Sequence, residues 1–248
     1  MDLRDIQSCL RAGIESRAAK VGPFLVLVSS GSDNPFGNYA VPVDGAAPTA
    51  DDVRALIEFF HRKERLPRLE YVRPAPGVDE PLTAAGFDVA GTLTLMALDD
   101  ELVPAPAADG YRVALVTDLP ALRQAVAVQN TAYGEGDREP DPGGLVRTIE
   151  GGGRVALAVH ATTGEPAGAG LSTDPQGGLV EIAGVGVLPE HRRHGIGALV
   201  TWALTAEALR RGHQSFLQVE KAEPFRVYQR IGYRVVGEMA DARRPIAD

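Results

Sequence analysis

The stretch LPEHRRHGIGALVTW, residues 188–202, places Arg192, Arg193, His194 and two glycines where an apolar helix begins. Helix N-termini usually favour Asp, Ser or Glu, because the aligned amide dipoles make that end positive. A bound anion would balance the added basic side chains, since the first turn of a helix has unpaired N–H groups that can hold a phosphate. The stretch therefore predicts a di- or polyphosphate site, and a plain tight turn remains the alternative.

The glycines at 195 and 197 would let a ligand approach the main chain, because glycine has no Cβ. The stretch is not a Walker-type loop, since no Gly-Lys-Ser/Thr follows it. It is not Gly-x-Gly-x-x-Gly either, because position 200 is Val. What it contains is Arg192-x-x-Gly195-x-Gly197, directly after the apolar segment EIAGVGVL.

This pattern resembles the pyrophosphate loop of the GCN5-related N-acetyltransferase (GNAT) family, in which Gln/Arg-x-x-Gly-x-Gly/Ala follows a strand that pairs with the pantetheine arm. The resemblance covers residues 111–240 in element order. It implies acetyl-CoA as the cofactor, with its pantetheine amides bonded by the main chain at Val185, Gly186 and Val187. It also implies that the pyrophosphate is held by the loop residues Arg192, Arg193, His194, Gly195, Ile196 and Gly197.

Glycines within the preceding strand indicate a β-bulge or a close backbone approach near Gly184 and Gly186. Glu181 is a carboxylate in the same, otherwise apolar strand, where many GNAT enzymes place a general base. A lysine-like amine has a pKa near ~10.4, so a base must remove its proton, and partial burial would raise the pKa of a Glu toward ~6–7. An exposed structural position at the start of the strand is the alternative.

Tyr228, in FRVYQRIGY (225–233), matches the tyrosine that many family members use as a general acid toward the departing thiolate. A core aromatic on a short helix is the alternative. Family members often carry an Asn seven residues before this Tyr, but Lys221 stands there, and its role is open. Asn130 and Tyr133 fall where the family often receives its acceptor; they are pocket candidates, with a plain surface loop as the alternative.

Hydrophobic periodicity and turn residues predict the same succession of elements in each half of the chain. Each half ends in a helix, a strand, a short helix, a Gly-aromatic pair and a strand, and a Pro/Ala-rich linker lies at 99–110. The predicted helices are 2–19, a helix from about 49, 80–86, 117–134, 195–211 and 224–233. The predicted strands are 24–30, 38–43, 68–74, 91–98, 111–116, 154–160, 166–174, 178–188, 215–220 and 234–240.

We therefore predict an α/β fold of two GNAT-like lobes, each with a mixed, mostly antiparallel central sheet flanked by helices. Residues 1–104 would form a degenerate N-terminal lobe and residues 105–248 the acetyl-CoA-binding domain; two unrelated lobes are the alternative. The first lobe looks degenerate because Asp51 and Asp52 begin its helix and would repel a phosphate. Leu82 also stands where Tyr228 stands in the second half.

The net charge of −8 over 248 residues argues against a general nucleic-acid or anionic-membrane partner and favours cationic ligands. Cys9 is the single cysteine, which fits a reducing cytoplasm. No apolar run approaches the ~20 residues of a membrane helix, and we see no signal peptide. We expect no metal site, because His191 and His194 have no cysteine or carboxylate cluster beside them.

These observations predict a cytoplasmic N-acetyltransferase that moves acetyl from acetyl-CoA to a primary amine of a small molecule, by direct transfer in a ternary complex. A protein acetyltransferase acting on N-termini or lysines is one alternative. A non-catalytic acyl-CoA sensor that uses the same phosphate loop is another. A homodimer is left open.

Overall fold

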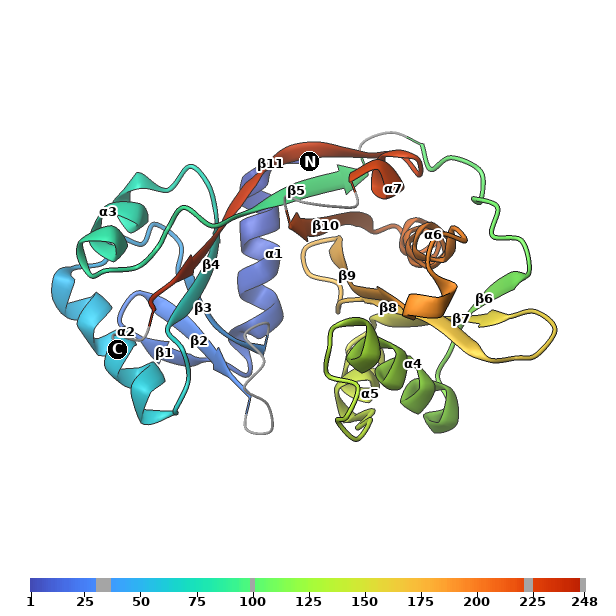
Figure 1. Cartoon of the computed structure of the whole chain (residues 1–248). Coiled ribbons are helices and arrows are strands. Elements are labelled where there is room, and N and C mark those ends of the chain that lie inside the picture. The colour runs from blue at the N-terminus through green and yellow to red at the C-terminus, as the bar shows by residue number, and fades with distance from the viewer. Residues whose placement is uncertain (30–36, 99–100, 221–224, 246–248) are drawn as a thin grey trace. The chain divides into compact units, whose positions relative to one another are not determined.

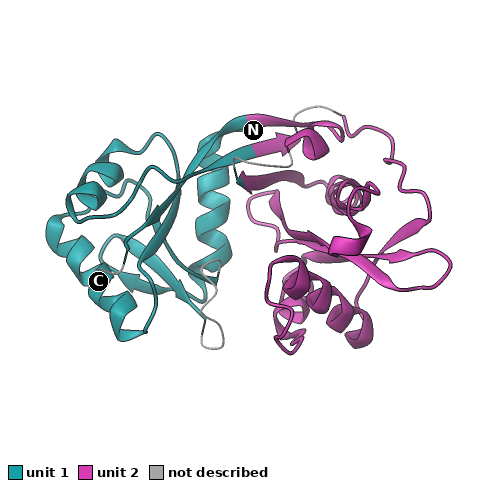
Figure 2. Ribbon diagram, in the orientation of Figure 1, with its two compact units in different colours: residues 1–95, 220–222, 236–248 teal, residues 96–219, 223–235 magenta. Residues whose placement is uncertain are grey.

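The computed structural model describes residues 1–29, 37–98, 101–220 and 225–245 (Figure 1). The chain divides into two compact units (Figure 2). Unit 1 comprises residues 1–95, 220–222 and 236–248, and unit 2 comprises residues 96–219 and 223–235. The end of the chain thus belongs to unit 1, whereas the predicted division assigned all of residues 105–248 to the second lobe. The division at 104/105 stays a proposal about the two lobes.

Unit 1 is a twisted sheet with helices α2 and α3 on one face and α1 on the other (Figure 1). Its strand order is β1-β2-β3-β4-β11, in which only the β3–β4 pair is parallel. Strands β5 and β11 each contribute residues to both units. The elements are α1 (Leu3–Glu15), β1 (Ala19–Val21), β2 (Phe24–Val28), β3 (Asn38–Pro42), α2 (Ala50–Arg62), β4 (Arg68–Val72), α3 (Pro76–Ala84), β5 (Thr92–Leu98) and β11 (Tyr233–Arg243).

Unit 2 has the strand order β11-β5-β10-β9-β8-β7-β6. Strands β6 to β9 pair antiparallel and β9 pairs parallel with β10, which confirms the predicted mixed, mostly antiparallel sheet. Helix α6 covers one face, and α4 and α5 cover the other (Figure 1). The elements are β6 (Tyr111–Leu115), α4 (Leu119–Ala132), α5 (Gly143–Glu150), β7 (Arg154–His160), β8 (Pro166–Ser172), β9 (Leu179–Val187), a 3-10 turn (Pro189–His191), α6 (Ile196–Arg210), β10 (Gln214–Glu220) and α7 (Phe225–Gln229).

Helix α6 lies close to the sheet because two glycines of β8 make room for it. A Cβ on Gly168 would lie 2.5 Å from Ile196 Cγ2, and one on Gly170 would lie 2.9 Å from Val200 Cγ1. Ile196, Val200 and Leu204 are buried at four-residue spacing, so they lie on one face of the helix and turn it toward the sheet. The small residues of β8 therefore determine how closely α6 packs on the sheet.

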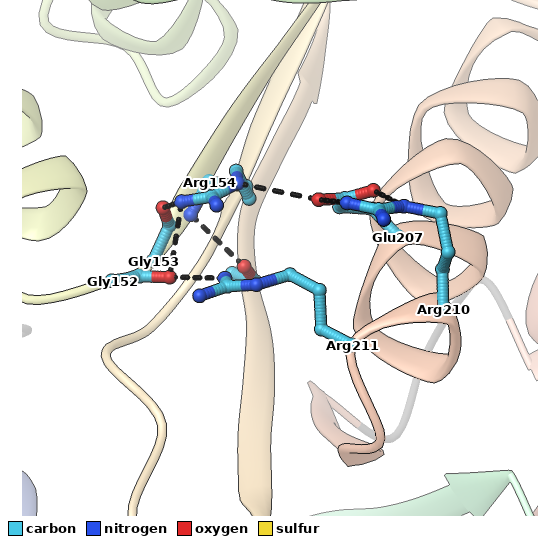
Figure 3. Close-up of polar contacts among 7 residues, drawn as sticks. Gly152, Gly153, Arg154, Glu207, Arg210 and Arg211 are labelled. Atoms are coloured by element: carbon cyan, nitrogen blue, oxygen red, sulfur yellow. Dashed lines mark hydrogen bonds and ion pairs between the residues drawn. The ribbon is translucent and has the colours of Figure 1, made fainter.

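Charged side chains hold the C-terminal end of α6 (Figure 3). Arg210 Nε donates to Glu207 Oε2 at 2.7 Å, and Arg154 Nε lies 3.5 Å from Glu207 Oε1. The hydrogen bonds from Arg210 hold the pKa of Glu207 below its usual value. Arg211 Nη1 donates to the carbonyl of Gly152 at 2.5 Å (Figure 3). These contacts join α6 to the turn before β7, so the far end of the helix is also fixed.

In unit 1, a buried charge cluster joins β11 to β4. Arg68 is fully buried, contacts the carboxylate of Glu70 and donates from Nε to Asp241 Oδ1 at 2.7 Å. Arg243 Nη2 lies 2.6 Å from Asp241 Oδ2. Burial alone would raise the pKa of Asp241, but the hydrogen bonds from Arg243 and Arg68 bring it below its usual value. Burial raises the pKa of Glu70.

Among the residues that the structure describes, no helix has the length and apolar character needed to cross a membrane.

We predict that Asp241→Asn lowers the free energy of unfolding of the chain by about 3 kcal/mol, because it leaves the buried Arg68 without its closest ion-pair partner on β11. Chemical denaturation followed by circular dichroism measures the change. The control is Asp51→Asn, since this carboxylate is exposed and pairs with an exposed Arg54; its expected change is below about 0.5 kcal/mol. Equal effects for the two variants would contradict the prediction.

Candidate functional site

The first turn of α6 has no side-chain cap. Its N-cap is Gly195, with φ +78°, and Arg193 also lies in the left-handed region, with φ +68°. A non-glycine residue in this region is uncommon, and left-handed residues within a turn bring successive N–H groups together to form an anion-binding concavity. Arg192 and Arg193 are exposed. The loop therefore offers amides and positive charge to a ligand without a carboxylate of its own at the helix start.

Helix α2 of unit 1 begins in the opposite way. Thr49 Oγ1 accepts from the N–H of Asp52 at 3.2 Å, and Asp52 Oδ2 accepts from the N–H of Thr49 at 2.8 Å. The hydrogen bonds from Thr49 lower the pKa of Asp52. This capping box satisfies the amides of the first turn with the helix's own side chains.

The two glycines of the α6 loop have different surroundings. A Cβ on Gly195 would lie 2.7 Å from the carbonyl oxygen of Ala107, so this glycine makes room for the segment before β6. That segment is also held by Trp202 Nε1, which donates to the carbonyl of Val103 at 2.8 Å. A Cβ on Gly197 would contact only Val187 Cγ2, at 3.7 Å. Of the two, Gly197 leaves the main chain open to a ligand.

Strand β9 carries the expected bulge. Ala169 faces Gly186 and Leu171 faces Ala183, so β9 has one extra residue between these pairs. Gly184 has φ +59°, and its carbonyl accepts from Gln129 Nε2 at 2.8 Å. A Cβ on Gly186 would lie 2.7 Å from the Cβ of Ala132. The close backbone approach expected at these glycines is made by helix α4.

Glu181 lies where β9 and β10 separate. The ladder pairs Leu179 with Gln214 and ends at Glu181 and Phe216, the last paired residues described, although β9 continues to Val187. Glu181 is half-buried, and its N–H donates to Thr173 Oγ1 at 2.9 Å. Glu181 is therefore fixed by its main chain on the β8 side, at the last described pair of the β9–β10 ladder.

Beyond that point, side chains occupy two carbonyls of β9. Tyr133 Oη donates to the carbonyl of Val185 at 3.2 Å, and Arg192 Nε donates to that of Val187 at 3.3 Å. The structure thus brings together three groups of predicted site residues: the pantetheine strand, the pocket candidate Tyr133 and the phosphate loop.

Tyr228 is half-buried on α7, and its ring meets that of Tyr233 edge-on, with centroids 6.4 Å apart. Tyr233 is buried and shares hydrogen bonds of 2.7 Å with Thr205 and Ser215. Burial, with a smaller contribution from the charge of Tyr133, raises the pKa of Tyr228 to about 12. Its hydroxyl is therefore protonated near neutral pH and is able to donate a hydrogen bond.

The other predicted residues lie apart from this arrangement or outside it. Asn130 Nδ2 donates to the carbonyl of Arg138 at 3.3 Å, so it holds the loop after α4. His191 Nδ1 shares a hydrogen bond of 2.9 Å with the Tyr111 hydroxyl. The described residues contain no group of three or more side chains suited to a metal ion. Lys221 lies outside the described residues.

The sequence reasoning missed Gln129, Thr173 and Tyr233, which orient β9 and Tyr228. One signal was available for the first of them. Gln129 stands four residues before Tyr133, so both lie on the same face of a predicted helix. Thr173 and Tyr233 act through contacts with segments distant in sequence, which spacing alone does not show.

Comparison with known proteins supports this description. Residues 124–233 match the model of the acetyltransferase (GNAT) family. No curated protein matches the chain. A GCN5-related N-acetyltransferase from Kribbella flavida has a similar structure, with a TM-score of 0.79 and 24% identity, over 99% of this chain and 96% of that one.

Two further solved structures share the fold at 17% identity. A GCN5-related N-acetyltransferase from Sphaerobacter thermophilus matches 99% of this chain and 93% of its own, with a TM-score of 0.68. A tandem GNAT protein from the clavulanic acid biosynthesis pathway, solved without AcCoA, matches 95% of this chain and 87% of its own, with a TM-score of 0.61. The fold of the whole chain is therefore that of GNAT proteins, including a tandem one.

We predict opposite effects on stability for two Gly→Ala substitutions. Gly186→Ala lowers the free energy of unfolding by about 1–3 kcal/mol, because its methyl group meets Ala132 of α4 at 2.7 Å. Gly197→Ala raises it by about 0.5–1 kcal/mol, because alanine suits the first turn of α6 better and has room there. Denaturant titration of both variants checks the pair, and a destabilised Gly197→Ala would contradict our description of the α6 loop.

Proposed function

Because residues 124–233 form an acyltransferase domain of the acetyltransferase (GNAT) family, we propose that this protein moves acetyl from acetyl-CoA to a primary amine of a small molecule. The observation that carries the proposal is the separation of β9 from β10 at Glu181, with the uncapped start of α6 directly beyond β9. Together they provide a polar strand edge and an anion site along one continuous stretch of chain.

The residues present fit a coenzyme A group. The main-chain amides of residues 192–197, with the exposed Arg192 and Arg193, would hold its pyrophosphate. The main chain at Val185, Gly186 and Val187 would bond its pantetheine amides. Gly197 leaves the loop open on the side where a Cβ would otherwise project. When bound, acetyl-CoA supplies an acyl thioester.

In this proposal, Glu181 takes the proton of the acceptor ammonium group, directly or through one water molecule. Its half-buried position at the last described pair of the β9–β10 ladder suits this role, because a carboxylate there is partly shielded from water and can still meet an acceptor. Tyr228 donates to the departing sulfur with a hydroxyl that stays protonated at neutral pH. Base and acid act in one ternary complex, so acetyl passes directly to the amine.

A small cationic amine is the proposed acceptor class, because the chain carries a net charge of −8, which favours cationic ligands. Tyr133 is the proposed pocket residue, since it is 55% exposed and reaches Val185 with its hydroxyl. We place the protein in the cytoplasm, where its single cysteine would stay reduced.

Ligand-dependent stability tests the cofactor. We expect acetyl-CoA and coenzyme A to raise the thermal midpoint, and ATP and NAD to have little effect. At a concentration of about 100 Kd, binding to the native state adds about 2.7 kcal/mol. A panel of small primary amines, N-terminal peptides and lysine peptides then identifies the acceptor by release of free thiol. Binding of acetyl-CoA without release of free thiol in the presence of any acceptor would contradict the proposed enzymatic activity and support an acyl-CoA sensor.

We predict that Tyr228→Phe lowers kcat by about 10²–10⁴-fold and leaves the Kd for acetyl-CoA unchanged, because only the hydroxyl that protonates the leaving thiolate is lost. Thiol release with the acceptor found in the panel gives kcat, and calorimetry gives Kd. The ring remains to pack edge-on against Tyr233, so the fold is retained. Unchanged turnover would make Tyr228 a packing residue.

A further inference from the structure

Two carbonyls on one edge of β9 accept hydrogen bonds from side chains. Just beyond the end of β9, Leu188 N–H donates to the carbonyl of Ala167 in β8, and in an antiparallel ladder the neighbouring residue turns its polar groups the other way. The carbonyl of Val187 accordingly faces away from β8 and accepts from Arg192 Nε. The carbonyl of Val185 accepts from the Tyr133 hydroxyl at 3.2 Å.

We propose that the Tyr133 hydroxyl competes with the pantetheine arm for the Val185 carbonyl, to which it donates in this structure, and that it releases this carbonyl when the arm binds. Tyr133 would then set the affinity for the cofactor, in addition to lying beside the acceptor. The inference rests on the proposed function, because it needs a ligand amide that bonds to Val185.

The surroundings of Tyr133 suit an exchangeable contact. Its side chain is 55% exposed and stands at the C-cap of α4, so water can take over the hydrogen bond of the released hydroxyl. The ring lies beside β9 at Gly186, since a Cβ built on this glycine would be 3.8 Å from Tyr133 Cε2. Loss of the Val185 contact therefore leaves the ring beside β9.

Gln129, one turn earlier on α4, makes a different contact. Its side chain is half-buried and donates to the carbonyl of Gly184 at 2.8 Å, a shorter bond to a residue in the left-handed region. This contact maintains the bulge whether or not a ligand is present. Helix α4 thus makes one permanent and one exchangeable hydrogen bond to successive carbonyls of β9.

Isothermal titration of the full chain with coenzyme A and with acetyl-CoA tests the proposal. We expect Tyr133→Phe to bind both ligands with a Kd about two- to ten-fold lower than wild type, the range of one net hydrogen bond. A purely structural role for the hydroxyl would weaken binding instead. Tyr71→Phe, which removes a tyrosine hydroxyl that donates to Asp79 in unit 1, is the matched control and should leave Kd unchanged.

A second variant, Gln129→Leu, removes the other α4 contact and should raise Kd, because the bulge loses its hydrogen bond. If the wild-type chain binds these ligands and Tyr133→Phe binds them with an equal or higher Kd, this inference alone is overturned. Absence of binding by the wild-type chain to either ligand would overturn the proposed function and this inference with it.

Discussion

After Glu181 and Phe216, β9 and β10 no longer share a ladder, and the rest of the site depends on how the unpaired edge of β9 is held. A strand edge with unpaired N–H and C=O groups is costly to bury and prone to pair with another chain. Here α4 supports it from the adjacent face, through Gln129 on the carbonyl of Gly184 and Tyr133 on that of Val185. This contact requires glycine at positions 184 and 186 of β9, since a Cβ at either position would collide with α4.

Besides a supported edge of β9, the proposed site requires that the start of α6 stay fixed while the amides of its first turn stay uncapped. Packing satisfies it: Ile196 and Val200 occupy the spaces above Gly168 and Gly170, and the ion pairs around Glu207 hold the other end. A helix held in this way needs no side-chain cap for stability. Its first turn can therefore remain available to an anion, whereas α2 uses Thr49 and Asp52 to satisfy its own amides.

Local patterns predicted what local interactions determine. The helix predicted at 195–211, the strand predicted at 178–188 and the bulge near Gly184 depend on residues close together in the sequence, and the structure confirms them, with α6 at Ile196–Arg210 and β9 at Leu179–Val187. Helix α5 was not predicted, because its eight residues begin with Gly143 and Gly144 after Pro142 and have no side-chain cap. The predicted first helix ran to 19 but ends at Glu15, because residues 19–21 form β1.

Contacts between distant segments could not be predicted in this way. Asp241 meets Arg68 across 173 positions, so no periodicity indicates that the C-terminal half of β11 belongs to unit 1. The site shows the same limit. From the sequence, Gly195 was expected to let a ligand approach the main chain. In the structure, the carbonyl oxygen of Ala107, a residue distant in sequence, lies 2.7 Å from the position of a Cβ on Gly195. Spacing thus predicted a role for the loop but could not show the neighbours of each residue.

The raised pKa of Tyr228 limits what its hydroxyl can do. A thiol resembling that of cysteine has a pKa near ~8.5, so proton transfer from a phenol with a pKa of about 12 to a free thiolate is unfavourable. It can stabilise the sulfur by hydrogen bonding while negative charge develops there, when the bond to the acyl carbon is breaking. The edge-on contact with Tyr233, which Thr205 and Ser215 hold by its hydroxyl, supports the ring of Tyr228. In the proposed mechanism, the Tyr228 hydroxyl would therefore act on the departing sulfur first as a hydrogen-bond donor, and complete proton transfer would require that the bound cofactor lower the pKa of Tyr228.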